Sequence, residues 1–207
     1  MNDLRFLKKF QLKLASEVLT RAFEHDPIFV ELFPESQTRY ERLYLLMTYC
    51  LRSYMRYGEV HVTSPKIEGV SLWYLWESEI ETREEIRKKE LFDNWLWFRL
   101  WAALGETTER IGSIHGEQVS VRNELLPNRH WYLMMIGVDP NHQGKGFASR
   151  LIYPMLARMD KKGLPCYLDT NNEGNVKIYE HIGFKLIKKY LIPGTSVLNW
   201  SMLWQRS

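Results

Sequence analysis

Cysteine is scarce in this sequence: its 207 residues include only Cys50 and Cys166, which lie far apart in the chain. Neither belongs to a Cys-x-x-Cys pair or to a Cys/His spacing typical of zinc ligands. A disulfide framework is therefore not expected, and no residue is assigned to a metal. Unpaired thiols are typical of a reducing compartment, which favours a cytoplasmic location.

The sequence also lacks a long apolar run and a large net charge. No segment approaches the ~20 apolar residues of a membrane-spanning helix. The first ten residues alternate charged and apolar side chains, unlike the apolar centre of a signal peptide. The formal net charge is only +3, from 28 basic and 25 acidic residues, and both signs are interspersed, as over 77–90. Neither a membrane nor a nucleic acid is therefore expected as a partner.

What the sequence contains is the composition of an ordinary globular domain, with 45% apolar and 26% charged residues. Its length suits one domain over residues 1–207. Periodicity predicts helices over 12–23, 36–57, 82–104, 106–126, 144–162 and 173–182. Strands are predicted over 59–63, 67–76, 131–138, 165–169, 184–192 and 197–204. The order of elements in the C-terminal third predicts an α/β sandwich around a mixed sheet.

Local signals set the boundaries of the first two helices. The pair Asp26–Pro27 is expected to interrupt the chain after the first helix, because a residue before proline avoids the α region. Ser36 or Thr38 is expected to cap the second helix, and Gly58 is expected to end it.

A glycine-containing turn follows the strand expected over 131–138. The segment 139–149 turns the chain at Asp139-Pro140 and then opens a helix with small residues. The first backbone N–H groups of a helix lack intrahelical partners and carry partial positive charge, so this turn could bind a diphosphate. A plain turn is the alternative. The Walker and dinucleotide patterns do not fit, because Gly146 follows Lys145 and Ser149 stands in place of a third glycine.

Two motifs in this part of the chain resemble the GNAT superfamily of N-acetyltransferases. Gln143-x-x-Gly146-x-Ala148 is similar to its Q/R-x-x-G-x-G/A coenzyme A signature. The run over 175–184, with Tyr179-Glu180 and Gly183-Phe184, is similar to the family motif that ends in Y-E-x-x-G-F. Together with the segment 130–133, these motifs most resemble the puromycin N-acetyltransferase-like branch. The specific similarity covers about 131–204.

This resemblance implies an α/β/α sandwich around a twisted, mixed, mostly antiparallel sheet that splays at the cofactor strand. It implies acetyl-CoA as acyl donor, with the pyrophosphate on the loop amides and the pantetheine arm beside the strand that ends at Val138. Gly137 suits such a close backbone approach. Asn172, about two helical turns before Tyr179, is expected to contact the same arm. The residues expected to bind coenzyme A are Ile136, Gly137, Val138, Gln143, Gly144, Lys145, Gly146, Phe147, Ala148, Ser149, Asn172 and Tyr179.

The resemblance also assigns catalytic roles. Tyr179 is expected to protonate the departing thiolate, since an ordinary phenol pKa of ~10 keeps it protonated near neutrality. A backbone N–H near Ile136 or Val138 is the expected donor to the oxyanion. His130 is the first candidate for the general base. The other candidates for the base are His25, Asp26, Asp169 and Glu173.

The segment 77–128 separates two strands that the family usually joins by a short connection. We expect a helical insertion that covers the acceptor site. Its aromatic side chains Trp95, Trp97, Phe98 and Trp101 either line that site or attach the insertion to the sheet. The expected reaction is direct acetyl transfer, in a ternary complex, to a primary amine of a small molecule, by a monomer or homodimer. The alternatives are a protein N-terminal or lysine acetyltransferase and a non-catalytic acyl-CoA-sensing domain.

Overall fold

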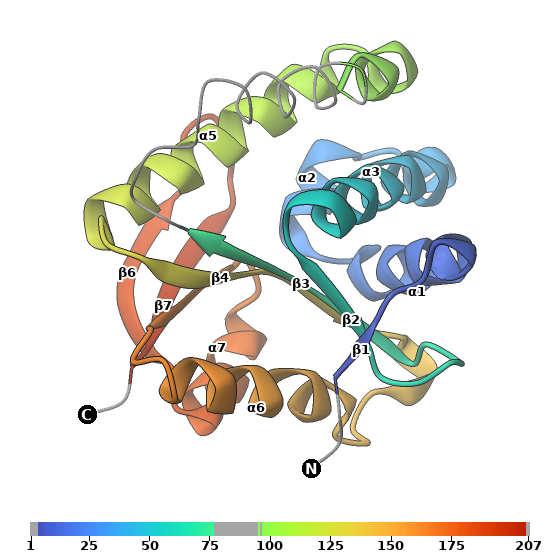
Figure 1. Ribbon diagram of the computed structural model, residues 1–207. Coiled ribbons are helices and arrows are strands. Elements are labelled where there is room, and N and C mark those ends of the chain that lie inside the picture. The colour runs from blue at the N-terminus through green and yellow to red at the C-terminus, as the bar shows by residue number, and fades with distance from the viewer. Residues whose placement is uncertain (1–3, 77–94, 96, 206–207) are drawn as a thin grey trace.

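A mixed sheet of seven strands forms the centre of the computed structural model, which describes residues 4–76, 95 and 97–205. The strand order is β1-β2-β3-β4-β5-β7-β6 (Figure 1). Only β4 and β5 pair in parallel, and the other neighbours are antiparallel. The strands are β1 (Arg5–Phe6), β2 (Glu59–Val62), β3 (Gly69–Trp76), β4 (His130–Val138), β5 (Cys166–Thr170), β6 (Lys185–Leu191) and β7 (Leu198–Trp204). This is the expected mixed, mostly antiparallel α/β architecture.

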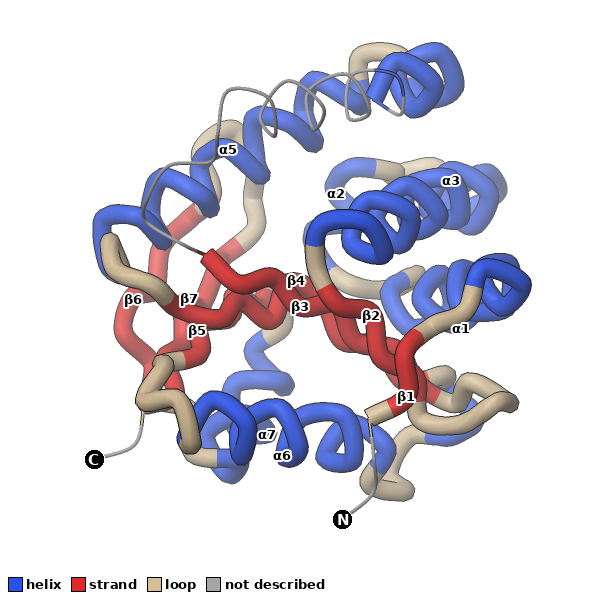
Figure 2. Tube along the Cα trace, in the orientation of Figure 1, coloured by secondary structure: helices blue, strands red, loops and turns tan. Residues whose placement is uncertain are grey.

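Helices cover both faces of the sheet (Figure 2). One face carries α1 (Leu12–Phe23), α2 (Pro27–Leu32), α3 (Ser36–Tyr57) and α5 (Thr107–Leu125). The opposite face carries α6 (Phe147–Asp160) and α7 (Glu173–Ile182). Each layer encloses its own cluster of buried apolar side chains. Within the described ranges, no helix is both long enough and apolar enough to cross a bilayer.

Most predicted elements agree closely with those in the structure, but a helix, an N-cap and a strand differ. Helix α2 was not predicted: Pro27 is its first residue and Asp26 is its N-cap, so the pair that ends one helix also starts the next. Neither Ser36 nor Thr38 caps α3, because the N-cap is Glu35 and no side chain makes the capping bond. Strand β1 was also missed, since two residues carry no periodicity.

The segment 77–128 is only partly described. Residues 77–94 and 96, which include most of the helix predicted over 82–104, lie outside the described residues, whereas 97–104 are helical. Gly105, with φ of +57°, separates them from α5 as expected. Helix α5 continues through Gly112 and Gly116 and closely matches the prediction over 106–126.

Strands β4 and β5 diverge after a short parallel ladder. Trp131–Leu133 pair with Cys166–Leu168, and no further pairs join the two strands, although β4 continues to Val138 and β5 to Thr170. The register between β3 and β4 also shifts at this point, so that Met134 is an extra residue of β4. The sheet is therefore open beside residues 134–138, which is the predicted splay at the cofactor strand.

Helix α1 packs closely against Gly137 of β4. A Cβ added there would lie 2.9 Å from Leu19 Cδ2 and 3.0 Å from Ala22 Cβ. We expect Gly137→Ala to lower the free energy of unfolding by about 1–3 kcal/mol, because the helix would have to move outward. Urea denaturation measures this change. Gly116→Ala is the control: its site in α5 is open, and the variant should be slightly more stable. Equal stability of wild type and Gly137→Ala would contradict the close packing.

Candidate active site

The turn between β4 and α6 presents uncapped backbone amides. Gly144 and Gly146 both have φ of +75°, and Gly146 is the N-cap of α6 in the left-handed conformation. A glycine N-cap has no side chain to bond the first N–H groups of the helix, here those of Phe147, Ala148 and Ser149. A Cβ at either glycine would meet nothing within 4 Å. The turn thus exposes donors and partial positive charge that suit an anion such as a diphosphate.

Hydrogen bonds from side chains stabilise this turn. Arg21 of α1 donates from Nε to Asp139 Oδ2 at 2.8 Å and forms an ion pair with it. Burial alone would raise the pKa of Asp139, but the bonds from Arg21 and Asn141 and the charge of Arg21 hold that pKa below its ordinary value. Gln143 donates to Val138 O at 3.3 Å, and Lys145 donates to Asn141 O at 3.0 Å. Both predicted loop residues therefore hold the turn in place.

Tyr179 belongs to α7, the helix that follows β5, whereas the turn follows β4 on the other side of the splay. Its side chain is 9% exposed and packs edge-to-face on Phe184, with ring centroids 5.8 Å apart. Burial raises the pKa of Tyr179 well above its ordinary value, and the charge of Asp26 adds to the increase. The phenol is therefore protonated at neutral pH.

Asn172 is placed differently from the geometry we expected. Its backbone is extended, it is the N-cap of α7, and its Oδ1 accepts a bond from Gly174 N at 2.9 Å. The helix does not extend back to Asn172, so the expected two-turn alignment with Tyr179 is wrong. Asn175, one turn before Tyr179, lines the same cavity as that residue. A contact between Asn172 and the cofactor stays a prediction.

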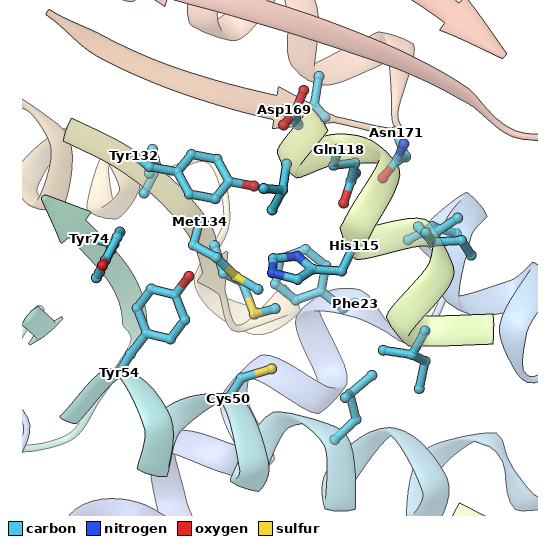
Figure 3. Close-up of a pocket in the computed structure, with 18 of the residues that line it drawn as sticks. Phe23, Cys50, Tyr54, Tyr74, His115, Gln118, Tyr132, Met134, Asp169 and Asn171 are labelled. Carbon is cyan, nitrogen blue, oxygen red and sulfur yellow. The ribbon is translucent and has the colours of Figure 1, made fainter. Parts of the chain in front are cut away.

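A cavity of about 480 Å³ adjoins the splay, between the sheet and helices α2, α3 and α5. Figure 3 shows Tyr54, Tyr74 and Tyr132 on one side of this cavity, with His115 and Gln118 entering from α5. Tyr179 and Ile136 also line it, so the cavity reaches the open edge of β4. Its mixture of aromatic walls and a few polar groups is typical of a small-molecule site.

Of the four aromatic side chains of the insertion, Trp97 lines the cavity, whereas the structure gives neither expected role to the other three. Trp97 lines the cavity and packs edge-to-face on Tyr49, with centroids 5.8 Å apart. Trp95, Phe98 and Trp101 are exposed, at 51%, 62% and 47%. Trp76, at the end of β3, is also part of the cavity wall.

Asp169 forms the polar end of the cavity. Its Oδ1 accepts bonds from Tyr167 OH at 2.9 Å, Asn199 Nδ2 at 2.7 Å and Ser201 Oγ at 2.9 Å, whereas its buried Oδ2 has no partner among the described residues. Burial raises the pKa of Asp169 despite these bonds and the positive charge of Arg122. Arg122 itself is 4% exposed and lies over the Tyr132 ring, with Cζ 4.6 Å from the centroid.

The candidate bases occupy different places. His130 is fully buried, its Nδ1 lies 2.7 Å from Asn128 O, burial lowers its pKa, and it is not among the residues that line the cavity. His25 and Glu173 line a separate surface hollow. Asp26 and Asp169 both line the cavity.

Sequence reasoning missed His115, which lines the cavity from α5. Burial and the charge of Arg122 lower its pKa. His115, Gln118 and Arg122 recur at spacings of three and four along one helix face, a signal that the sequence did contain.

Comparisons with known proteins agree with this geometry. The family model described as the acetyltransferase (GNAT) family matches residues 72–184, which is more than half of the chain. An uncharacterized N-acetyltransferase of Schizosaccharomyces pombe is 29% identical over 181 residues, which cover 83% of this chain and 70% of that protein.

Solved structures share the fold at low identity. A Corynebacterium glutamicum protein, named as histone acetyltransferase HPA2 and related acetyltransferase, aligns with a TM-score of 0.65 and 16% identity over 99% of this chain and 96% of its own. Arylalkylamine N-acetyltransferase 2 of Aedes aegypti aligns with a TM-score of 0.62 and 13% identity over 98% of both chains. The sheet, the splay and the loop thus accompany a matching family model, and the chain belongs to the GNAT family of acetyltransferases.

Proposed function

We propose that this protein transfers an acetyl group from acetyl-CoA to a primary amine of a small molecule, directly and within a ternary complex. The observation that carries the proposal is the cavity of about 480 Å³ that meets the open edge of β4 and Tyr179. An amine in the cavity would lie next to an acyl group placed in the splay. The chain's own residues would then bind, orient and exchange protons with both substrates.

The cofactor side of the proposal rests on backbone geometry. Residues 144–149 combine two open glycines with uncapped amides, which fits a pyrophosphate. Residues 136–138 lie beyond the β4–β5 ladder, so the backbone on that edge is free to pair with a pantetheine arm. We assign coenzyme A binding to these residues together with Gln143, Asn172 and Tyr179.

The chemistry follows from the groups at the junction. Attack of a neutral amine on the thioester forms a tetrahedral oxyanion, which a backbone N–H near Ile136 or Val138 would stabilise. Tyr179 would give its proton to the departing thiolate, because burial keeps the phenol protonated. The role of His130 as base stays a prediction, since its ring lies outside the cavity wall.

The insertion favours a small acceptor over a peptide. Helix α5 forms one wall of the cavity, with His115 and Gln118 pointing into it (Figure 3), and such a wall suits a small acceptor better than an extended peptide. Asn175 belongs to the run over 175–184 that resembles the puromycin N-acetyltransferase-like branch, and it lines this cavity. Both cysteines are buried free thiols, which agrees with a cytoplasmic enzyme. The proposed enzyme is a monomer or a homodimer.

A screen of acceptors tests the proposal. We expect release of coenzyme A from acetyl-CoA when small primary amines with an apolar or aromatic body are added, measured as free thiol. Peptides with a free N-terminus or a lysine should give much slower release. Binding of coenzyme A in calorimetry without turnover on any amine or peptide would favour the sensing domain. Absence of both binding and turnover would contradict the assigned cofactor.

A further inference from the structure

Asp26 lines the cavity, and local structure fixes its side chain. It is the N-cap of α2, and its Oδ1 accepts a bond from Ile28 N at 3.2 Å. Within the described part of the chain, the carboxyl group of Asp26 accepts this one hydrogen bond. Phe23 precedes Asp26 in the sequence and Phe29 follows it, and their rings pack edge-to-face with centroids 5.7 Å apart. A half-buried carboxylate with a spare oxygen thus lines an apolar part of the cavity.

Asp26 and Tyr179 lie within electrostatic reach of each other. They come from different helices, α2 and α7, and both line the cavity together with Ile136 of the open strand edge. The negative charge of Asp26 contributes to the raised pKa of Tyr179. The two groups therefore flank the junction at which the proposed amine and thioester would meet.

We propose that Asp26 is the general base that removes the proton from the attacking amine, a role that rests on the proposed function. The amine nitrogen forms a bond to the thioester carbonyl carbon, and Asp26 accepts one N–H proton as that bond forms. The C–S bond then breaks, and the thiolate takes the phenolic proton of Tyr179. Asp26 returns its proton to the Tyr179 phenolate through water. The products are the N-acetylated amine and coenzyme A thiol, and both side chains regain their starting states.

The carboxyl group is tuned for this task by its surroundings. Burial raises the pKa of Asp26 to about 6, outweighing the bond from Ile28 N. A base with that pKa is ionised at neutral pH and still accepts a proton readily. The other charged or titratable side chains that line the cavity are Tyr49, Cys50, Tyr54, Tyr57, Tyr74, His115, Arg122, Tyr132, Asp169 and Tyr179. None of these contributes to the shift at Asp26, so burial sets the pKa of this group.

The remaining candidates are placed less well for this step. Asp169 also has a carboxylate oxygen without a partner among the described residues, but its Oδ1 accepts three hydrogen bonds in a structural network, and its charge does not act on Tyr179. His115 belongs to α5, and burial and the positive charge of Arg122 lower its pKa. Its charge does not act on Tyr179. Asp26 is the carboxylate whose charge acts on the expected acid.

Asp26→Asn tests the inference, because asparagine caps a helix as well as aspartate but cannot accept the proton. The acceptor is the best amine from the screen, at saturating concentration of both substrates. We expect kcat at pH 8 to fall by about 10²-fold or more. The wild-type kcat/KM, which reports the ionisation of the free enzyme, should rise with pH through about 6 as the carboxylate forms, and the variant should lack this step.

Stability of the same variant separates catalysis from folding. The folded-state pKa of Asp26 is raised, so its stabilising contribution is present below the unfolded pKa and is lost as pH rises through about 6. Asp26→Asn should therefore have a Tm at pH 8 equal to or above that of wild type. A lower kcat with an unchanged or higher Tm supports a catalytic role.

Two further variants identify the base. Asp26→Glu keeps a carboxylate and should restore part of kcat and the rise near pH 6. His115→Gln should keep that rise even if its KM for the amine changes. An active wild type whose pH rise survives in Asp26→Asn, or disappears in His115→Gln, would overturn the assignment. An inactive wild type would instead contradict the proposed function itself.

Discussion

Replacing Tyr179 by phenylalanine is expected to lower kcat by about 10²- to 10⁴-fold, the range for loss of a general acid. Burial and the charge of Asp26 raise the pKa of the phenol, so the group is protonated across the range in which the enzyme can be assayed. Without the hydroxyl, the thiolate must leave unprotonated or take its proton from water. Coenzyme A affinity should change little, because the ring still packs on Phe184. Steady-state kinetics and calorimetry together measure both effects.

Tyr190→Phe is the matched control for this prediction. Tyr190 lies on β6, and it is not among the residues that line the cavity. Its hydroxyl is buried and has no hydrogen-bond partner in the part of the chain that the structure describes. Burial also raises the pKa of Tyr190, so the two phenols share the same general setting. Removal of its hydroxyl should leave kcat close to the wild-type value. Similar kcat values for Tyr179→Phe and Tyr190→Phe would remove Tyr179 from the mechanism.

A valine at position 146 is expected to weaken coenzyme A binding by about 100-fold or more. A β-branched residue is strongly disfavoured at the φ of +75° that Gly146 adopts. The start of α6 would therefore have to change, and the new side chain would stand where a phosphate must approach the amides. Calorimetric titration with coenzyme A measures this effect without any acceptor.

Gly163→Val separates strain from binding. Gly163 also has a positive φ, +62°, and a Cβ there would likewise meet nothing within 4 Å, but it lies in the turn after α6. Both variants should lose stability, whereas only Gly146→Val should lose coenzyme A affinity. Equal affinities of the two variants would show that the turn before α6 is not the pyrophosphate site.

Local signals predicted most elements of this fold. The spacing of Ala15, Val18 and Leu19 gave α1 its correct bounds, because that face packs against the sheet and is almost fully buried. Gly58 ended α3 as expected. Helix α2 was missed although its signal was present: Asp26 and Pro27 are a helix-starting pair, and we interpreted them only as a break.

The candidate site was predictable only where its residues are close in sequence. The loop over 143–149 and Tyr179 were identified from motifs. The ion pair of Arg21 with Asp139 joins residues 118 positions apart, and no periodicity reveals such a partner. His130 illustrates the same limit, since burial behind the cavity wall depends on how Trp76 and Tyr167 pack around it.

The short ladder between β4 and β5 has a mechanical consequence. Three residue pairs join the half of the sheet that leads into the turn before α6 to the half that leads into α7. The distance between that turn and Tyr179 therefore depends on a narrow joint. A ligand bound in the splay would contact both halves of the sheet at once, and it would therefore fix their relative position. Recognition of the acyl donor and alignment of the proton donor would then be one event.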